Sequence, residues 1–218
     1  MAGLRIFYGG TFDPVHEGHL AIARAARASF GEPVHVMPAA DPPHRPPPGA
    51  SAHHRVAMLE LALVGEPGLL LDLRELHRDG PSYSVDTLHA LRAEFGADAP
   101  LALLVGADSF LGLPTWHRWQ ELFGLAHFIV AGRPGSLLET APAELRAAAD
   151  GRWTEDPAAL RAAPAGALLH LHQSLHVHSA TAVRRLIGEG RAWQHLLPPA
   201  VAGYVQAHGL YGAAGADR

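Results

Sequence analysis

The sequence predicts an α/β protein whose core is a doubly wound parallel sheet, folded as a single domain over residues 1–218. Short apolar runs alternate with helix-type patterns along most of the 218 residues, as in successive βαβ units. Hydrophobic residues make up 48% of the chain and charged residues 17%, which is enough apolar material for a sizeable core and excludes global disorder. The most apolar run, residues 101–105, is expected as a central strand because parallel strands are covered on both faces.

The expected elements follow in order from the N-terminus. Strands are expected at residues 4–8, 34–38, 69–73, 101–105, 128–130 and 168–172. Helices are expected at residues 20–30, 51–64 with Ser51 as N-cap, 84–95 with Ser84 as N-cap, 181–187 and 198–208. Residues 134–166 are expected as an irregular or helical excursion, and residues 179–211 as a small C-terminal helical part.

Composition excludes several kinds of chemistry. The chain has no cysteine and no lysine, so disulfides, thiolate nucleophiles, Walker-type phosphate loops and Schiff bases are absent. Seventeen basic and 21 acidic residues give a net charge of −4, which argues against a nucleic-acid-coating surface. The N-terminus runs directly into a strand pattern and no long apolar segment follows. A cytoplasmic protein without a membrane partner is therefore expected.

The loop after the first expected strand is the most informative segment, because ligands of doubly wound sheets bind beyond the carboxyl ends of the strands. Gly9 and Gly10 allow the backbone to approach an anion, and the following helix directs its free N–H groups to the same point. His16 and His19, three residues apart, can face that point together. Taken alone, a Gly-Gly pair is more often a simple turn, and a histidine pair can also cap a helix or bind metal.

The string GGTFDPVHEGH at residues 9–19 resembles the H-x-G-H signature of the nucleotidyltransferase superfamily. The second signature of that superfamily, S-x-T-x-x-R, is matched by Ser179, Thr181 and Arg184. Ser179 and Thr181 can cap a helix whose first N–H groups stay free for phosphate, and the planar guanidinium of Arg184 suits phosphate oxygens. Without the first string, this segment would be an ordinary capped helix with a surface arginine.

Within this superfamily the chain is similar to the bacterial nicotinate-nucleotide adenylyltransferases over nearly its whole length. The matching segments include residues 42–45 (PPHR), 81–84 (PSYS), 106–109 (GADS), 114–116 (PTW), 133–135 (RPG) and 209–211 (GLY). The resemblance implies adenylyl transfer from ATP to nicotinate mononucleotide in NAD biosynthesis, with Mg²⁺ accompanying ATP. Ala39 and Ala40 stand where many members carry asparagine, so any amide contact from there is lost.

The resemblance also implies the site residues. The catalytic residues would be His16, His19 and Arg184. ATP would be bound by Gly9, Gly10, Thr11, Phe12, His16, His19, Gly106, Asp108, Ser109, Ser179, Thr181 and Arg184. The acceptor would be bound by His44, Arg45, Ser84, Thr87, Trp116 and Arg133.

Three alternatives stay open at this stage. One is a sister nucleotidyltransferase that uses nicotinamide mononucleotide or phosphopantetheine as acceptor. Another is a non-catalytic nucleotide-binding module. The third is a metal-dependent hydrolase, which a metal site at His170, His172, His176 and His178 would favour, although an intrinsic metal site is not expected. The sequence also leaves open whether the protein forms a homodimer.

Overall fold

The computed structural model describes residues 3–40, 49–78, 82–132, 140–172 and 179–213. Its centre is a parallel sheet with the strand order β3-β2-β1-β4-β5-β7-β6. The strands are β1 (Arg5–Gly10), β2 (Val34–Pro38), β3 (Leu69–Leu71), β4 (Leu101–Gly106), β5 (His127–Ala131), β6 (Trp153–Thr154) and β7 (Leu168–Leu171). From β1 the chain adds β2 and β3 on one side of the sheet, and it then crosses over to add β4 and the later strands on the other side. The boundary between β1 and β4 is therefore the switch point expected of a doubly wound sheet.

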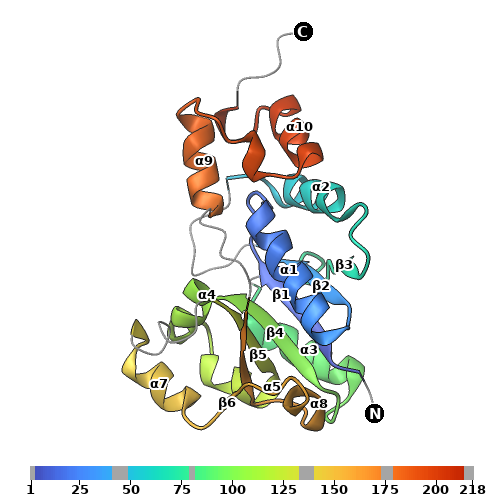
Figure 1. Ribbon diagram of the computed structural model, residues 1–218, viewed down its shortest axis with the longest axis vertical. Coiled ribbons are helices and arrows are strands. Elements are labelled where there is room, and N and C mark those ends of the chain that lie inside the picture. The colour runs from blue at the N-terminus through green and yellow to red at the C-terminus, as the bar shows by residue number, and fades with distance from the viewer. Residues whose placement is uncertain (1–2, 41–48, 79–81, 133–139, 173–178, 214–218) are drawn as a thin grey trace.

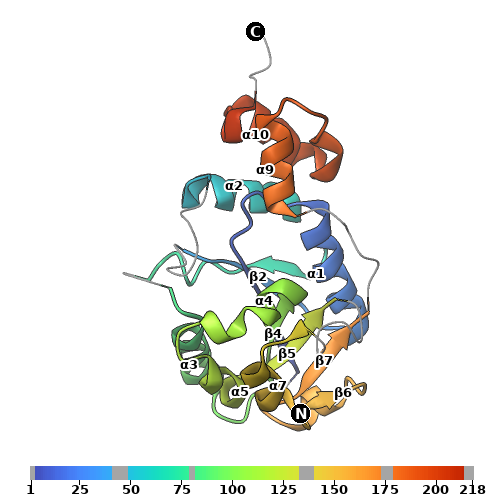
Figure 2. The same cartoon turned by 90° about the vertical axis from the view of Figure 1, so that its left-hand side faces the viewer.

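Helices cover the two faces of the sheet and build a separate layer at one end (Figures 1 and 2). The helices are α1 (Glu17–Phe30), α2 (Ala52–Leu63), α3 (Ser84–Phe95), α4 (Ala107–Leu111), α5 (Leu122–Leu125), α7 (Ala143–Ala149), α8 (Ala159–Ala162), α9 (Ala180–Gly188) and α10 (Pro199–Ala207). In both views α2, α9 and α10 lie together at the end of the molecule reached by the carboxyl end of β1. The expected C-terminal helices are therefore present, and they sit beside the loop that follows β1.

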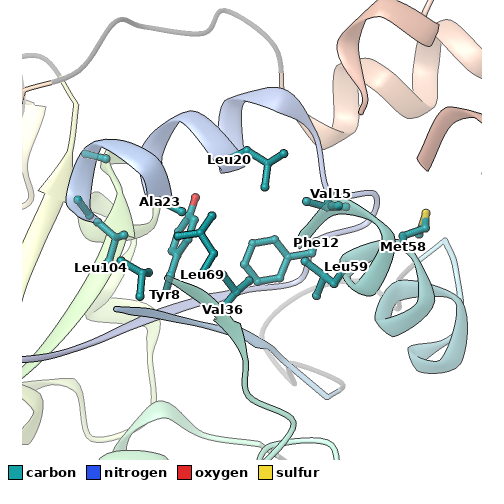
Figure 3. Close-up of a cluster of buried hydrophobic side chains, with 14 of the residues drawn as sticks. Tyr8, Phe12, Val15, Leu20, Ala23, Val36, Met58, Leu59, Leu69 and Leu104 are labelled. Atoms are coloured by element: carbon teal, nitrogen blue, oxygen red, sulfur yellow. The ribbon is translucent and has the colours of Figure 1, made fainter. Parts of the chain in front are cut away.

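The apolar core has two halves, one on each side of the sheet. Successive side chains of a strand point to opposite faces, so Ile6 and Tyr8 of β1 pack on the α1 side while Phe7 packs on the α3 side. Figure 3 shows the first half, in which Leu20 and Ala23 of α1 lie over side chains of the sheet. Burial on both faces explains the continuous apolar runs in the sequence.

Several boundaries differ from the expectations. Helix α1 begins at Glu17, because His16 is already its N-cap, and α3 begins at Ser84 with Tyr83 as its N-cap. The prediction that Ser84 caps this helix is therefore wrong: it is the first helical residue. Ser51 and Ser179 do cap their helices, each accepting a backbone N–H three residues further on.

The segment expected as an irregular or helical excursion contains α7, α8 and the two-residue strand β6, which pairs with β7 at the edge of the sheet. In the part of the chain that the structure describes, no helix combines the length and apolar character that crossing a bilayer requires.

Candidate active site

The loop after β1 is tightly packed around Phe12. Gly10 leaves no space for a side chain, since a Cβ atom there would lie 2.9 Å from Cζ of Phe12. Phe12 itself has a φ of 50° and is buried, with its ring edge-on to those of Tyr8 and His19. Its side chain therefore belongs to the core, and a contact between Phe12 and a nucleotide would have to come from its backbone.

His16 and His19 lie against each other at the start of α1. Their ring centroids are 3.7 Å apart, and the backbone N–H of His16 donates to Nδ1 of His19 at 3.3 Å. Burial and the neighbouring His16 hold the pKa of His19 well below its ordinary value of 6.5. His19 is consequently neutral at pH 7, and because Nδ1 accepts a hydrogen bond its proton is on Nε2.

The second motif reaches the first directly. Nη1 of Arg184 on α9 donates to the backbone carbonyl of Asp13 at 2.6 Å and lies 3.5 Å from Oδ2 of the same residue. Nη2 of Arg184 lies 3.4 Å from Oγ1 of Thr181. The two strings, which are far apart in the sequence, thus meet beside the carboxyl end of β1.

Asp13 links the first motif to the second, and the sequence analysis assigned it no role. Its carboxylate is 3% exposed and accepts the backbone N–H groups of Gly49 at 2.7 Å and Ala50 at 3.0 Å. It also accepts the hydroxyl of Tyr211 at 2.7 Å. The signal was present, because Asp13 is an acidic residue inside an otherwise uncharged loop, but its partners lie 36 to 198 positions away.

Arg55 of α2 is a second residue that sequence reasoning missed. Its side chain is fully buried and donates to the carbonyl of Thr11 at 2.9 Å. It also donates to the carbonyls of Ala39 at 2.7 Å and Ala40 at 2.8 Å. One guanidinium therefore fixes the backbone after β1 and after β2, at the two alanines where an amide side chain is lacking.

A pocket opens where the carboxyl ends of β1, β2 and β4 meet. Of the predicted site residues, it is lined by Gly9, Gly10, Thr11, Ser84, Thr87, Ser109 and Trp116. It is also lined by residues that were not predicted, namely Met37, Ala39, Glu75, Ser82, Leu103 and Val105. Trp116 is half-buried at this pocket, whereas Trp119, three residues further on, is buried in the core. The structure thus places Trp116, the tryptophan that the resemblance assigns to the acceptor, at this pocket.

A hydrogen-bonded chain forms one wall of this pocket. The hydroxyl of Thr87 donates to Oε1 of Glu75 at 2.8 Å and accepts from Nη1 of Arg78 at 3.0 Å. Burial raises the pKa of Glu75, and the hydrogen bond from Thr87 partly offsets this effect. Because the only hydroxyl proton of Thr87 goes to Glu75, this side chain cannot also donate to a ligand.

The other predicted residues are distributed as follows. Gly106 and Asp108 lie at the junction of β4 and α4, at the carboxyl end of the sheet. His44, Arg45 and Arg133 are outside the described residues, as are His176 and His178.

His170 stacks on Trp153 with ring centroids 4.0 Å apart, and burial lowers its pKa. The described stretches hold no group of three or more His, Asp or Glu side chains arranged to bind a metal.

Residues 7–186 match the cytidylyltransferase-like family. Among curated relatives, a protein of Stenotrophomonas maltophilia (strain K279a) is 60% identical over 217 residues, covering 97% of this chain and 98% of the relative. A protein of Xylella fastidiosa (strain M12) is 49% identical with the same coverage, and both carry the name "Probable nicotinate-nucleotide adenylyltransferase".

The fold is similar to that of Plasmodium falciparum nicotinic acid mononucleotide adenylyltransferase complexed with NaAD. The TM-score is 0.69 at 16% identity, covering 96% of this chain and 97% of that one. This likeness supports the architecture. The matches to the two curated relatives cover nearly the full length of this chain and of each relative. The chain belongs to the nicotinate-nucleotide adenylyltransferase family of cytidylyltransferase-like proteins.

Proposed function

We propose that this protein transfers the adenylyl group of ATP to nicotinate mononucleotide, giving deamido-NAD and pyrophosphate in NAD biosynthesis. The observation that carries the proposal is the contact of Arg184 with Asp13, which brings to one site the two motifs that the resemblance assigns to nucleotide binding. That site adjoins a pocket with an aromatic side chain, Trp116, and the N-terminal turn of α3. A pyridine ring can stack on the former, and a helix N-terminus favours an anion such as a ring carboxylate.

The chemistry requires alignment more than proton transfer. The acceptor phosphate is already anionic at pH 7, so its oxygen can attack the α-phosphorus of ATP without a general base. The bond from that phosphorus to the bridging oxygen breaks, and pyrophosphate leaves with the electron pair. In-line placement of two bound reactants can contribute about 7–11 kcal/mol to such a step.

Stabilisation of the developing charge falls to groups at the two helix starts. Neutral His19 presents the N–H of Nε2 as a donor, and Arg184 presents a permanent positive charge. The positive dipole end of α1 adds to this stabilisation, with the N–H of His19 donating to the carbonyl of His16 inside the first turn. None of these groups needs to change protonation state during the transfer.

Magnesium fits this site as an ion carried by ATP. The carboxylate of Asp13, the residue that contacts Arg184, is buried and already accepts three hydrogen bonds. Mg²⁺ is typically held by substrate phosphates and water with few protein ligands, which agrees with a site built from imidazole, guanidinium and backbone N–H groups. When bound, it would neutralise charge on the phosphates.

On the acceptor side, Ser84, Thr87 and Trp116 line the pocket, and we propose that they contact the nicotinate moiety. The hydroxyl of Thr87 donates to Glu75 and its backbone N–H donates to the carbonyl of Tyr83 at 3.1 Å, so Thr87 would shape the pocket rather than donate a hydrogen bond to an anion. We retain His44 and Arg45 as proposed ligands of the acceptor phosphate, and Arg133 as a proposed ligand of the acceptor, on the resemblance stated above.

The decisive experiment is an acceptor panel with MgATP. Pyrophosphate release is measured with nicotinate mononucleotide, nicotinamide mononucleotide and phosphopantetheine at equal concentrations. We expect the highest kcat/KM with nicotinate mononucleotide and a dinucleotide product of the mass of deamido-NAD. Preference for another acceptor would identify a sister enzyme, and ATP binding without turnover of any acceptor would identify a non-catalytic module.

A further inference from the structure

The C-terminal end of the described chain is tied to the loop that carries the first motif. Tyr211 lies in the 3-10 turn Leu210–Gly212, and its hydroxyl donates to Oδ1 of Asp13 at 2.7 Å. Two further donors to this carboxylate, the backbone N–H groups of Gly49 and Ala50, precede α2. A buried carboxylate depends on such donors, so the turn contributes to holding Asp13 in place.

The backbone conformation of Tyr211 indicates that surrounding interactions hold this turn in place. Tyr211 has a φ of 59°, in the left-handed region that bulky residues rarely occupy. A residue persists in that conformation only where surrounding interactions over-determine it. The hydrogen bond to Asp13 is such an interaction, and it joins residues 198 positions apart.

The ring of Tyr211 also packs where Arg184 passes. A Cβ atom on Gly49 would lie 3.1 Å from Cδ1 and Cε1 of Tyr211 and 3.4 Å from Cδ of Arg184. The aromatic ring, the glycine and the aliphatic stem of Arg184 therefore crowd one small volume. The guanidinium beyond this stem is bound to the carbonyl of Asp13, the residue that also accepts the hydroxyl of Tyr211.

We propose that Tyr211 is a positioning residue for ATP binding and adenylyl transfer, which acts by fixing Asp13 and, through it, the guanidinium of Arg184. This inference rests on the proposed function for the identity of the reaction. Tyr211 itself directs its hydroxyl to Asp13, so its effect on a bound nucleotide passes through Arg184 and the loop after β1.

Tyr211→Phe tests the hydroxyl while keeping the ring. The matched control is Tyr204→Phe on α10, whose hydroxyl lies 2.9 Å from Nδ1 of His54, away from Asp13. We expect Tyr211→Phe to lower kcat/KM for ATP about tenfold or more, with KM for the acceptor changed less than about twofold. Tyr204→Phe should leave both parameters within about twofold of wild type.

Two further measurements distinguish a positioning role of Tyr211 from a purely structural one. Assays are run well below the Tm of each variant, so loss of stability alone would leave kcat and the Kd for ATP unchanged. Arg184→Ala and the double variant Tyr211→Phe/Arg184→Ala are then compared. If Tyr211 acts through Arg184, adding the tyrosine substitution to Arg184→Ala should lower kcat/KM by less than about twofold.

Equal behaviour of Tyr211→Phe and Tyr204→Phe would overturn the proposal, as would fully additive losses in the double variant. The Kd for MgATP, measured by calorimetry without any acceptor, separates this outcome from failure of the proposed function. If the wild type binds MgATP but turns over no acceptor, the Kd values of the two tyrosine variants still decide the role of Tyr211.

Discussion

The backbone N–H of His16 donates to Nδ1 of His19, and the two imidazole rings stack with centroids 3.7 Å apart. This contact at the start of α1 fixes the tautomer of His19, since a ring nitrogen that accepts a hydrogen bond carries no proton. Nε2 is then the donor that His19 offers to a phosphate. Burial keeps the pKa of the ring low, so the donor is a neutral imidazole across the neutral pH range.

His19→Ala should lower kcat by about a hundredfold or more, a loss of about 2.7 kcal/mol of transition-state stabilisation. The fold should persist, because the apolar side chains that surround this ring, Tyr8 and Phe12 among them, are unchanged. Pyrophosphate release and thermal unfolding check the two halves of this prediction. His53→Ala, at an exposed histidine of α2, is the control and should keep full activity. A folded His19→Ala enzyme with near-normal kcat would contradict the assignment.

Acid should destabilise the protein through its buried histidines. Ring Nδ1 of His127 accepts the N–H of Ala167 at 3.0 Å, Nε2 lies 2.9 Å from the carbonyl of Ala163, and burial lowers the pKa. Because the unfolded chain takes up a proton first, the contribution of these histidines to the free energy of unfolding is fully present above about pH 6.5. It decreases below that pH by up to about 1.4 kcal/mol per pH unit for each such histidine.

Urea unfolding of wild type and His127→Gln between pH 7.5 and 5.0 measures this effect. The variant should be less stable at neutral pH but should show a shallower pH dependence than wild type. Parallel pH dependences would show that His127 does not titrate on unfolding.

Trp116→Ala should raise KM for nicotinate mononucleotide about tenfold, with KM for ATP nearly unchanged, because it removes the aromatic wall of the acceptor pocket. Trp119→Ala is the contrasting variant, since that side chain is 8% exposed in the core. It should lower the free energy of unfolding by about 3–5 kcal/mol. Steady-state kinetics and urea unfolding distinguish the two, and a selective rise in KM for ATP in Trp116→Ala would exclude the stacking role.

Glu75→Gln should become more stable relative to wild type as the pH rises. Burial raises the pKa of Glu75, so its folded form holds a proton more tightly than the unfolded chain does. Its contribution to stability is therefore present below about pH 4.5 and is lost as the pH rises. The difference in unfolding free energy between Glu75→Gln and wild type should increase from pH 4 to pH 7.5. Glu60→Gln, at an exposed position of α2, should show no such trend.

Arg55→Met should destabilise the protein by about 3 kcal/mol or more, because three backbone carbonyls would lose their buried donor. Arg24→Met is the control. Arg24 is paired with Glu17 and Glu66 at the surface, with a side chain 45% exposed, and its loss should cost less than about 1 kcal/mol. Equal losses in the two variants would show that the bonds of Arg55 do not hold the loops.

Local patterns were sufficient to predict the fold and most of its elements. The alternation of apolar runs and helix patterns predicted the doubly wound sheet, which is confirmed, because parallel strands buried on both faces are continuous apolar runs in the sequence. Ser51 and Ser179 were correctly predicted as caps, since a cap depends on residues only three positions away, whereas Thr181 is not a cap because α9 already begins at Ala180. Ser84 was wrongly predicted as a cap, since helix entry there is set one residue earlier, at Tyr83.

The sequence by itself determined which chemical groups are available: a glycine pair, two histidines three residues apart, an arginine on a capped helix, and neither lysine nor cysteine. Only the tertiary structure decided that Asp13 joins the two motifs, that Arg55 lies buried beneath the loops, and that Tyr211 bonds to the loop after the first strand. The reason is physical. A side chain bonded to a partner many positions away obeys no local periodicity, and its role follows from which segments the core brings together.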